Sequence, residues 1–270
     1  MIDRYAVIGN PIEHSLSPHI HRLFAIQTQQ SLTYSKVLAP LDDFVGTLTG
    51  LQAHGFRGAN VTVPFKRQAF QLATRHSARA LATQTVNTLL LTDNDMLGDN
   101  TDGIGLVRDI QQNLYRPLKG LRVLLIGAGG AAQGVLPFLL SQAPARLAIS
   151  NRSLDKAQTM LSELAQDIDL LGFDDIAQQS FDIVINATSS GLSGAALPLP
   201  ASLFSPAVLA YDMVYGIETA FMALARRQGA QVMDGLGMLV EQAAEAFLLW
   251  RGVRPETQPV LVALRAGVTL

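Results

Sequence analysis

The sequence predicts an α/β protein made of two α/β domains. Apolar, strand-like runs alternate with amphipathic, helix-like runs along the 270 residues, and short glycine-containing turns join many of them. From about Leu121 onward these become regular strand–helix units. Such an alternation is typical of a mostly parallel, doubly wound sheet.

The composition excludes several classes of protein. The net charge is −2, so no basic surface field would attract nucleic acid. The chain has no cysteine, which excludes disulfides and thiolate metal sites. Charged residues occupy the N-terminus where a signal peptide would be apolar, and no apolar run reaches the ~20 residues of a membrane span. We therefore expect a soluble, cytoplasmic protein.

The first part of the chain is expected to contain three buried strands and a hairpin. The hairpin covers Thr85–Asn100 around an Asp93–Asn94–Asp95 turn. The strands are Arg4–Asn10, Leu32–Ala39 and Arg57–Pro64.

Helices are expected between these strands. One begins at Ser17, which we expect to be the cap, with Pro18 at the first helical position. A second lies within Leu41–Gly55, where Gly55 ends it. An amphipathic helix follows the "NTDGIG" segment and extends to about Asn113.

The second part of the chain is expected to form its own parallel sheet. A short strand in "GAQVMDG" and a long amphipathic helix at Gly237–Gly252 complete the pattern. We place a substrate domain at residues 1–102 and 236–270, so that the C-terminal helices return to it, and a second domain at residues 103–235. The main strands of this second domain are Leu121–Ile126, Arg146–Ser150, Asp182–Asn186 and Val208–Met213.

A glycine-rich turn follows the first of these strands. In "LRVLLIGAGGAA", Gly127, Gly129 and Ala132 match G-x-G-x-x-G/A, with a strand before the turn and a helix after it. The first glycine allows a tight turn, the second allows close approach of a pyrophosphate, and the third position allows close helix packing. The motif predicts a Rossmann-type domain that binds a dinucleotide.

The end of the next strand bears on the choice between NAD and NADP. An acidic residue there would hold a ribose 2′-hydroxyl, but this strand is followed by Asn151, Arg152 and Ser153. Arg152 is suited to pair with a 2′-phosphate, and Ser153 and Lys156 add donors. The pattern favours NADP, although Asp155 nearby leaves NAD use open.

Polar residues follow the strands of the first domain, where ligands of open α/β sheets bind. Hydroxyls, amides, one lysine and one aspartate suit a polyhydroxylated carboxylate. The residues are Ser15, Ser17, Asn60, Thr62, Lys66, Asn87, Asn100, Asp102 and, in the last long helix, Gln242.

Three histidines lie in the opening stretch "GNPIEHSLSPHIHR". They raise the alternatives of a metal site or of a serine nucleophile with a histidine base. His19 and His21 are two residues apart and thus lie on different faces of the helix that contains Pro18. We expect no metal and assign the binding role to the serines.

Eight motifs in order resemble the shikimate dehydrogenase family: "GNPIEHSLSPHIH", "NVTVPFK", "TVNTL", "DNTDGIG", "GAGGAA", "NATSSG", "DMVYG" and "EQAAEAF". They extend from Gly9 to Phe247. The resemblance implies an NADP-dependent oxidoreductase that reversibly reduces 3-dehydroshikimate to shikimate, in chorismate and aromatic amino-acid biosynthesis.

The resemblance also implies a role for each matched residue. Lys66 and Asp102 would be the catalytic pair. The substrate would be bound by Ser15, Ser17, Thr62, Lys66, Asn87, Asp102, Tyr215 and Gln242. NADP(H) would be bound by Gly127, Ala128, Gly129, Gly130, Ala131, Ala132, Asn151, Arg152, Ser153, Lys156, Thr188, Met213 and Gly235.

A chemical argument supports Lys66 as the acid. Hydride transfer to a carbonyl needs a proton donor at the oxygen, and a lysine ammonium beside a carboxylate is suited to that task. Two alternatives remain: a quinate/shikimate dehydrogenase that uses NAD or both cofactors, and a ligand-sensing protein without redox activity. The chain is expected to be a monomer or a homodimer.

Overall fold

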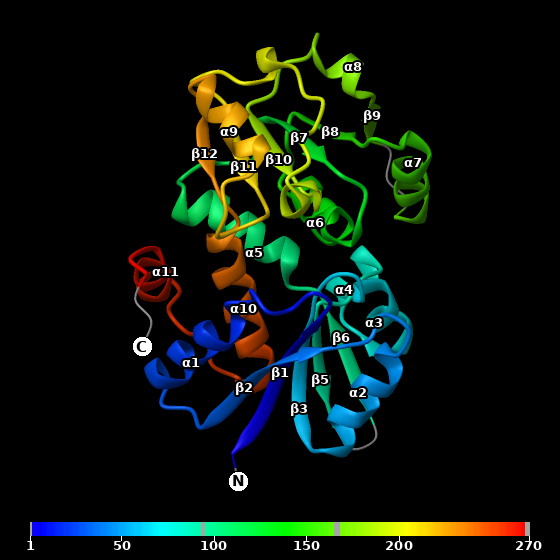
Figure 1. Cartoon of the computed structure of the whole chain (residues 1–270), viewed down its shortest axis with the longest axis vertical. Helices are drawn as coiled ribbons and strands as arrows, with labels where there is room; N and C mark the ends of the chain where they lie inside the picture. Colours follow the sequence, from blue (N-terminus) through cyan, green and yellow to red (C-terminus); the bar gives the residue numbers. More distant parts are fainter. Residues whose placement is uncertain (1, 93–94, 165–167, 268–270) are drawn as a thin grey trace. The chain divides into compact units, whose positions relative to one another are not determined.

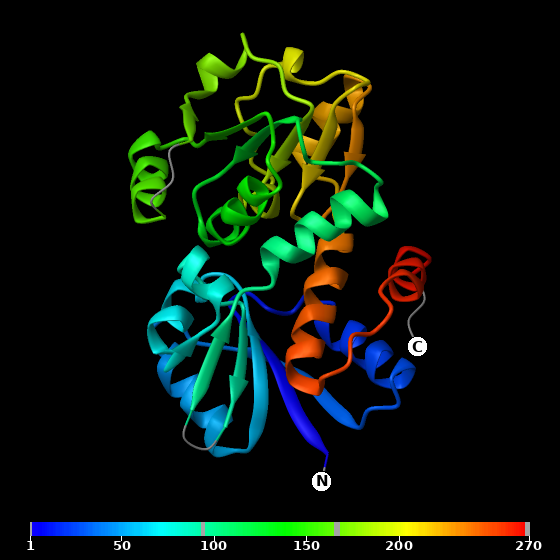
Figure 2. The same ribbon diagram turned by 180° about the vertical axis from the view of Figure 1, so that it is seen from behind.

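The computed structural model describes residues 2–92, 95–164 and 168–267, apart from the side chains of 192 and 193. The chain forms two compact units (Figures 1 and 2). Unit 1 comprises Met1–Gly105 and Leu239–Leu270, and unit 2 comprises Leu106–Met238. The sequence places the domain boundaries at 102/103 and 235/236. Asp93 and Asn94, in the expected hairpin turn, lie outside the described residues.

Unit 1 contains a mixed six-stranded sheet in the order β2-β1-β3-β5-β6-β4. Strand β1 pairs in parallel with β2 and β3, β5 is antiparallel to both β3 and β6, and β4 is parallel to β6. The three expected strands and the hairpin are confirmed. The strands are β1 Asp3–Gly9, β2 Leu32–Leu38, β3 Phe56–Val61, β4 Arg75–His76, β5 Thr88–Leu91 and β6 Met96–Asp99.

The sequence-based pattern does not include strand β4 or the two short helices between β3 and β5, Lys66–Leu72 and Ala78–Thr83. Helices α5 and α10 contain the two junctions between the units. The helices with residues in unit 1 are α1 Ser17–Gln27, α2 Phe44–Ala53, α3 Lys66–Leu72, α4 Ala78–Thr83, α5 Asp102–Arg108, α10 Leu236–Arg251 and α11 Gln258–Arg265.

The expected cap of α1 is wrong in detail. Leu16 is the N-cap, its side chain accepts no capping hydrogen bond, and Ser17 is the first helical residue. The Ser17 backbone N–H instead donates to Ser15 Oγ at 3.3 Å. Pro18 lies in the first turn as predicted, where its missing N–H costs nothing. Ser15 thus satisfies a backbone donor at the start of α1 that would otherwise lack a partner.

Strand β1 is buried on both faces. Ala6 and Ile8 pack into a core that includes Phe44 of α2, whereas Tyr5 faces the opposite way and stacks on Trp250 of α10 at 4.6 Å. Alternate residues of a strand point to opposite faces, so helices cover both sides of the sheet at this strand.

The same tryptophan fixes α10 on the sheet. Trp250 Nε1 donates to the Leu89 carbonyl oxygen at 2.9 Å. A Cβ atom on Gly58 of β3 would lie 2.4 Å from that nitrogen, so only glycine leaves room for the indole. The contact holds the helix that carries Gln242 against the strands.

Unit 2 contains a six-stranded sheet in the order β12-β11-β10-β7-β8-β9. All its strand pairs are parallel. Numbered within the unit, the order is 6-5-4-1-2-3, that of a dinucleotide-binding sheet. The strands are β7 Arg122–Ile126, β8 Arg146–Ser150, β9 Asp169–Leu171, β10 Ile183–Asn186, β11 Leu209–Asp212 and β12 Gln231–Met233.

Helices of unit 2 connect these strands, and short 3-10 turns at Ser190–Ser193 and Ala201–Leu203 complete the connections. The α5 helix continues at Asp109–Asn113 as one π-helical turn. In the parts of the chain described, no helix is long and apolar enough to cross a membrane. The α-helices wholly within unit 2 are α6 Gly130–Ser141, α7 Leu154–Glu163, α8 Phe173–Ile176 and α9 Ala220–Arg227.

Strand β7 lies at the centre of this sheet. Val123 and Leu125 pack into the core on one face, and Leu124 and Ile126 pack into the core on the other. The connection from β7 passes to β8 on one side, while β10 lies on its other side. Ligands of such sheets bind at the carboxyl ends of the strands where the order reverses, which is where the glycine turn follows β7.

Candidate active site

The predicted catalytic pair is in contact in unit 1. Lys66 is the first residue of α3 and Asp102 the first of α5. Lys66 Nζ lies 2.6 Å from Asp102 Oδ2, with the side chains 15% and 1% exposed. Two opposite charges are therefore removed from most of the solvent together, and each compensates the other.

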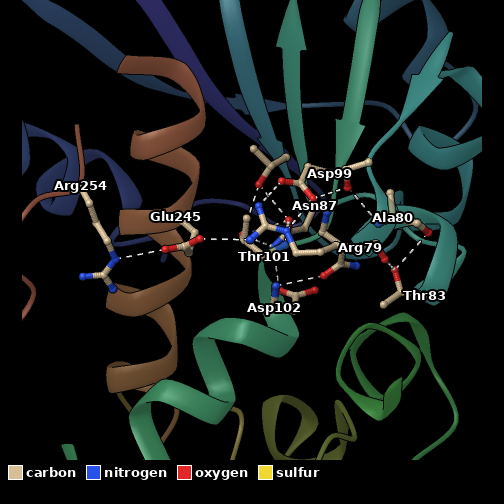
Figure 3. A network of polar contacts seen from close by, with 12 residues as sticks. Arg79, Ala80, Thr83, Asn87, Asp99, Thr101, Asp102, Glu245 and Arg254 are labelled. Carbon is tan, nitrogen blue, oxygen red and sulfur yellow. Dashed lines mark hydrogen bonds and ion pairs between the residues drawn. The ribbon is translucent and has the colours of Figure 1, made fainter. Parts of the chain in front are cut away.

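Asn87 joins this pair to helix α10. Its Nδ2 lies 2.9 Å from Asp102 Oδ1 and 2.8 Å from Gln242 Oε1. Its Oδ1 accepts the Thr101 backbone N–H at 2.8 Å, which fixes the amide orientation. Asn87, Thr101 and Asp102 lie together in Figure 3. The structure thus brings four predicted residues, from distant parts of the sequence, into one polar cluster.

The predicted carboxylate-binding residues follow β1 and β3, which are neighbours in the sheet. Ser15 lies between β1 and α1, and the buried Ser17 is the first residue of α1. No hydrogen bond of the Ser17 hydroxyl occurs within the residues described. Thr62 directly follows β3, and its backbone N–H donates to the Ile8 carbonyl at 2.9 Å. A Cβ atom on Gly9 would lie 2.4 Å from Thr62 Cγ2, so glycine lets the two strand ends meet.

The remaining predicted substrate residue is in unit 2. Tyr215 lies half-buried between β11 and α9. Asn60 and Asn100 lie near the cluster in a supporting role: Asn60 Nδ2 donates to Thr88 Oγ1, and Asn100 Oδ1 accepts the Asp102 N–H.

The glycine turn of unit 2 fits a pyrophosphate. Gly127 has φ +123°, and a Cβ atom there would lie 3.2 Å from the Ala187 backbone, so the fold itself requires this glycine. Gly129 has φ −96°, and a Cβ atom would meet nothing within 4 Å. Its missing side chain leaves open space next to residues 128–131 and the start of α6, whose N–H groups suit a phosphate. Ala132, in the first turn of α6, is fully buried.

Two exposed cations flank the turn after β8. Arg152, in the loop before α7, and Lys156, in the first turn of α7, have no ion pair among the described residues. Ser153 caps that helix, since its Oγ accepts the Lys156 N–H at 3.4 Å, while its O–H is left to donate elsewhere. Asn151 Nδ2 donates to the Ser153 carbonyl at 2.8 Å and shapes the loop. The donor set fits an adenosine 2′-phosphate.

The residues predicted for the nicotinamide end meet around Asn186, which begins the NATSSG motif but has no role assigned to it from the sequence. Asn186 Oδ1 accepts from Thr188 Oγ1 at 2.8 Å, and the Asn186 carbonyl accepts the Met213 N–H at 2.9 Å. A Cβ atom on Gly235 would lie 2.3 Å from the Met213 carbonyl oxygen. Asn186 Nδ2 also donates to Asp212, whose pKa is raised by burial.

The histidine-rich stretch has a structural role at one position. His21 is buried and stacks on Tyr34 at 4.3 Å and 7°. Within residues 2–92, 95–164 and 168–267, no group of three or more histidine, aspartate or glutamate side chains is placed to hold a metal ion.

Three family models match successive stretches of the chain. The family model of the shikimate dehydrogenase substrate-binding domain matches residues 7–89. The model of shikimate/quinate 5-dehydrogenase matches residues 109–193, and that of the shikimate 5′-dehydrogenase C-terminal domain matches residues 235–265.

Individual relatives match over nearly the full length. The NADP(+) shikimate dehydrogenase of Methylobacillus flagellatus is 60% identical over 98% of this chain and 100% of its own. An Ael1 enzyme from Pseudomonas putida is 47% identical, with a TM-score of 0.90 over 97% of this chain and 98% of its own. Shikimate 5-dehydrogenase from Thermus thermophilus, solved with NADP(H) and shikimate, is 32% identical, with a TM-score of 0.88 over 99% of this chain and 100% of its own. The chain belongs to the shikimate dehydrogenase family.

Proposed function

We propose that the chain catalyses the reversible, NADPH-dependent reduction of 3-dehydroshikimate to shikimate, in chorismate and aromatic amino-acid biosynthesis. One observation carries the proposal: Lys66 Nζ is held 2.6 Å from Asp102 Oδ2 within a cluster that also contains Asn87 and Gln242. An ammonium group that is fixed and largely shielded from water is suited to a carbonyl oxygen on which negative charge develops.

Unit 2 would hold the cofactor, which supplies a hydride when it is bound. Residues 127–132 would surround the pyrophosphate, and Asn151, Arg152, Ser153 and Lys156 the 2′-phosphate. Thr188, Met213 and Gly235 would line the nicotinamide end. The open space at Gly129 and the two cations without ion pairs among the described residues support this assignment.

Unit 1 would hold the substrate and move the proton. Ser15, Ser17 and Thr62 would bind the carboxylate, and Tyr215 stays a predicted substrate residue. Asn87, Asp102 and Gln242 would meet the ring hydroxyls. In the reductive direction Lys66 Nζ would give its proton to the carbonyl oxygen as the charge develops there, while Asp102 keeps the ammonium in place. In the oxidative direction the proton returns by the same route.

The domain roles are part of this proposal: residues 1–102 with 236–270 for the substrate, and residues 103–235 for the cofactor. The cytoplasmic location expected from the sequence and the choice between monomer and homodimer stay predictions.

A spectrophotometric assay of the purified full-length protein tests the function. Shikimate and quinate are each combined with NADP+ and NAD+, and absorbance of the reduced cofactor is followed. We expect shikimate with NADP+ to give the highest kcat/KM by at least about tenfold, because Arg152 and Lys156 offer charge to a 2′-phosphate. A preference for quinate or NAD+ would favour a quinate/shikimate dehydrogenase that uses NAD or both cofactors. Binding of shikimate without turnover in any combination would favour the ligand sensor.

A further inference from the structure

Arg79 lies at the centre of an ionic network in unit 1 (Figure 3). Its Nε donates to Asp99 Oδ1 at 3.0 Å, its Nη2 pairs with the other oxygen of the same carboxylate, and its Nη1 donates to Glu245 Oε2 at 3.1 Å. The Asp99 and Glu245 side chains are only 2% and 5% exposed. One guanidinium therefore joins two buried carboxylates from separate segments, in the bidentate geometry that arginine favours.

On one side of the network, hydrogen bonds connect Asp99 to Asp102. Asp99 Oδ1 accepts the Asn100 backbone N–H at 2.7 Å, and Asn100 Oδ1 accepts the Asp102 backbone N–H at 3.0 Å. The Asp99 backbone carbonyl also accepts the Asn87 N–H at 3.1 Å. Arg79 thus fixes the carboxylate on which the turn before Asp102 is built.

On the other side of the network, Glu245 is connected to Gln242 through helix α10. The two residues are three apart on α10 and so share one face of the helix. Arg254 holds the other oxygen of Glu245 at 3.1 Å and also pairs with Glu241 at 2.7 Å. Glu245 is therefore held from both sides, and its contact with Arg79 fixes this turn of α10 relative to α4.

Asn87 forms hydrogen bonds to both Asp102 and Gln242. Its Nδ2 reaches Asp102 Oδ1 and Gln242 Oε1 at 2.9 and 2.8 Å, so the two hydrogen bonds require a fixed separation between the turn at residues 99–102 and α10. Arg79 is bonded to both of these segments.

We propose that Arg79 is a positioning residue that sets the separation of Asp102 and Gln242, and with it the fit of the site to the substrate's ring hydroxyls. The inference rests on the proposed function, because it assigns those residues to the substrate. Glu245 can be changed more conservatively than Arg79, since Glu245→Gln keeps the shape of the side chain while it removes the charge and replaces one of the two acceptor oxygens by an amide nitrogen.

The first test compares Michaelis constants. Glu245→Gln and Glu245→Ala are expected to raise the KM for shikimate, Glu245→Ala by about tenfold, and to leave the KM for NADP+ within about twofold. Arg75→Ala is the matched control, because it removes an exposed ion pair with Asp95 from the same unit. It should leave both constants unchanged.

The second test is a double-mutant cycle of Glu245→Ala with Gln242→Ala. If Glu245 acts through Gln242, its effect on the KM for shikimate shrinks to less than about twofold in the Gln242→Ala background. A general loss of structure would give the same factor in both backgrounds and would overturn the proposal. So would an unchanged KM in Glu245→Ala, or equal rises for shikimate and NADP+. A wild-type protein without activity on shikimate would refute the proposed function and this inference together. If the wild type is active but the effects of Glu245→Ala and Gln242→Ala on the KM for shikimate simply multiply, the inference alone is refuted.

Discussion

Lys66 combines two tasks that single substitutions can separate: it compensates the buried Asp102 carboxylate, and it is proposed to donate a proton. Lys66→Ala should lower kcat by about 10²–10⁴-fold, the usual contribution of a general acid. It should also lower the thermal midpoint, because Asp102 then remains buried without its counter-charge.

Lys66→Arg is the informative partner of that variant. An arginine keeps the positive charge next to Asp102 but does not release its proton in the accessible pH range. We expect a thermal midpoint near that of the wild type together with a kcat almost as low as that of Lys66→Ala. A kcat near the wild-type value in Lys66→Arg would show that charge alone suffices and would remove Lys66 from the role of acid.

The two glycines of the cofactor turn make a matched pair, because the fold needs only one of them. Gly127→Ala places a side chain at φ +123° against the Ala187 backbone and should destabilise the protein by about 1–3 kcal/mol. Gly129→Ala meets no protein atom within 4 Å and should leave the thermal midpoint almost unchanged. Its methyl group would instead occupy the space proposed for the pyrophosphate, so the KM for NADPH should rise by about tenfold or more. An unchanged KM would place the cofactor elsewhere.

The loop between β8 and α7 is the element proposed to select the cofactor. Arg152 is exposed and has no ion pair among the described residues, so its removal should cost little stability. Arg152→Ala is expected to raise the KM for NADPH by about tenfold and to leave the KM for NADH nearly unchanged, because only NADPH carries the 2′-phosphate. Arg122→Ala, which removes a surface ion pair with Asp182 in the same unit, is the control. Equal increases for both cofactors would contradict the assignment.

The long buried elements are predictable from the sequence because burial marks them directly. The apolar run Val123–Ile126 marks a strand, since helices cover both faces of a parallel sheet. The short α3 and α4 helices lack that signal: only Ala69 is buried in α3, and α4 has six residues. The predicted cap of α1 is wrong because the backbone places Leu16, between the two serines, at the N-cap position, so that Ser17 is already helical and its N–H donates to Ser15 Oγ.

The candidate site likewise contains residues that the sequence predicts and residues that it does not. Motifs identify side chains that carry chemistry, such as Lys66 and Gln242, but not those that fix their spacing. Arg79 lies outside the eight motifs, and Glu245 lies within EQAAEAF but has no role assigned to it there. The two are 166 positions apart, and a polar residue on a helix is ordinarily a solvated one, so the sequence does not indicate their contact. Only the packing of α10 on the sheet, through Trp250 and Gly58, brings them together.

At the scale of the whole molecule, His21 links the stability of unit 1 to pH. Burial lowers the pKa of His21 to about 3 from its usual 6.5. Below pH 6.5 the unfolded chain binds a proton that the folded chain does not, so stability decreases as the pH falls from 6.5 toward 3 and is unaffected by this group above 6.5. The limiting slope from this histidine alone is about 1.4 kcal/mol per pH unit.

The chain offers its own probe for this effect. Trp250 is the single tryptophan, and it lies in unit 1 with its ring 5.3 Å from that of His21, so its fluorescence reports unfolding of this unit and not of unit 2. Denaturant unfolding would be followed by this fluorescence at several pH values between about 4.5 and 7.5, for the wild type and for His21→Phe.

His21→Phe keeps an aromatic ring stacked on Tyr34 and removes the titrating group. A change in stability that is equal at all pH values would come from the larger ring in a packed core. The contribution of His21 titration appears only as a difference between the two proteins in the slope of unfolding free energy against pH. The variant should therefore lose about 1.4 kcal/mol less per pH unit than the wild type well below pH 6.5, and the two profiles should be parallel above it. Parallel profiles over the whole range would mean that His21 is protonated in the folded protein, and that the cluster of rings around it admits a charge.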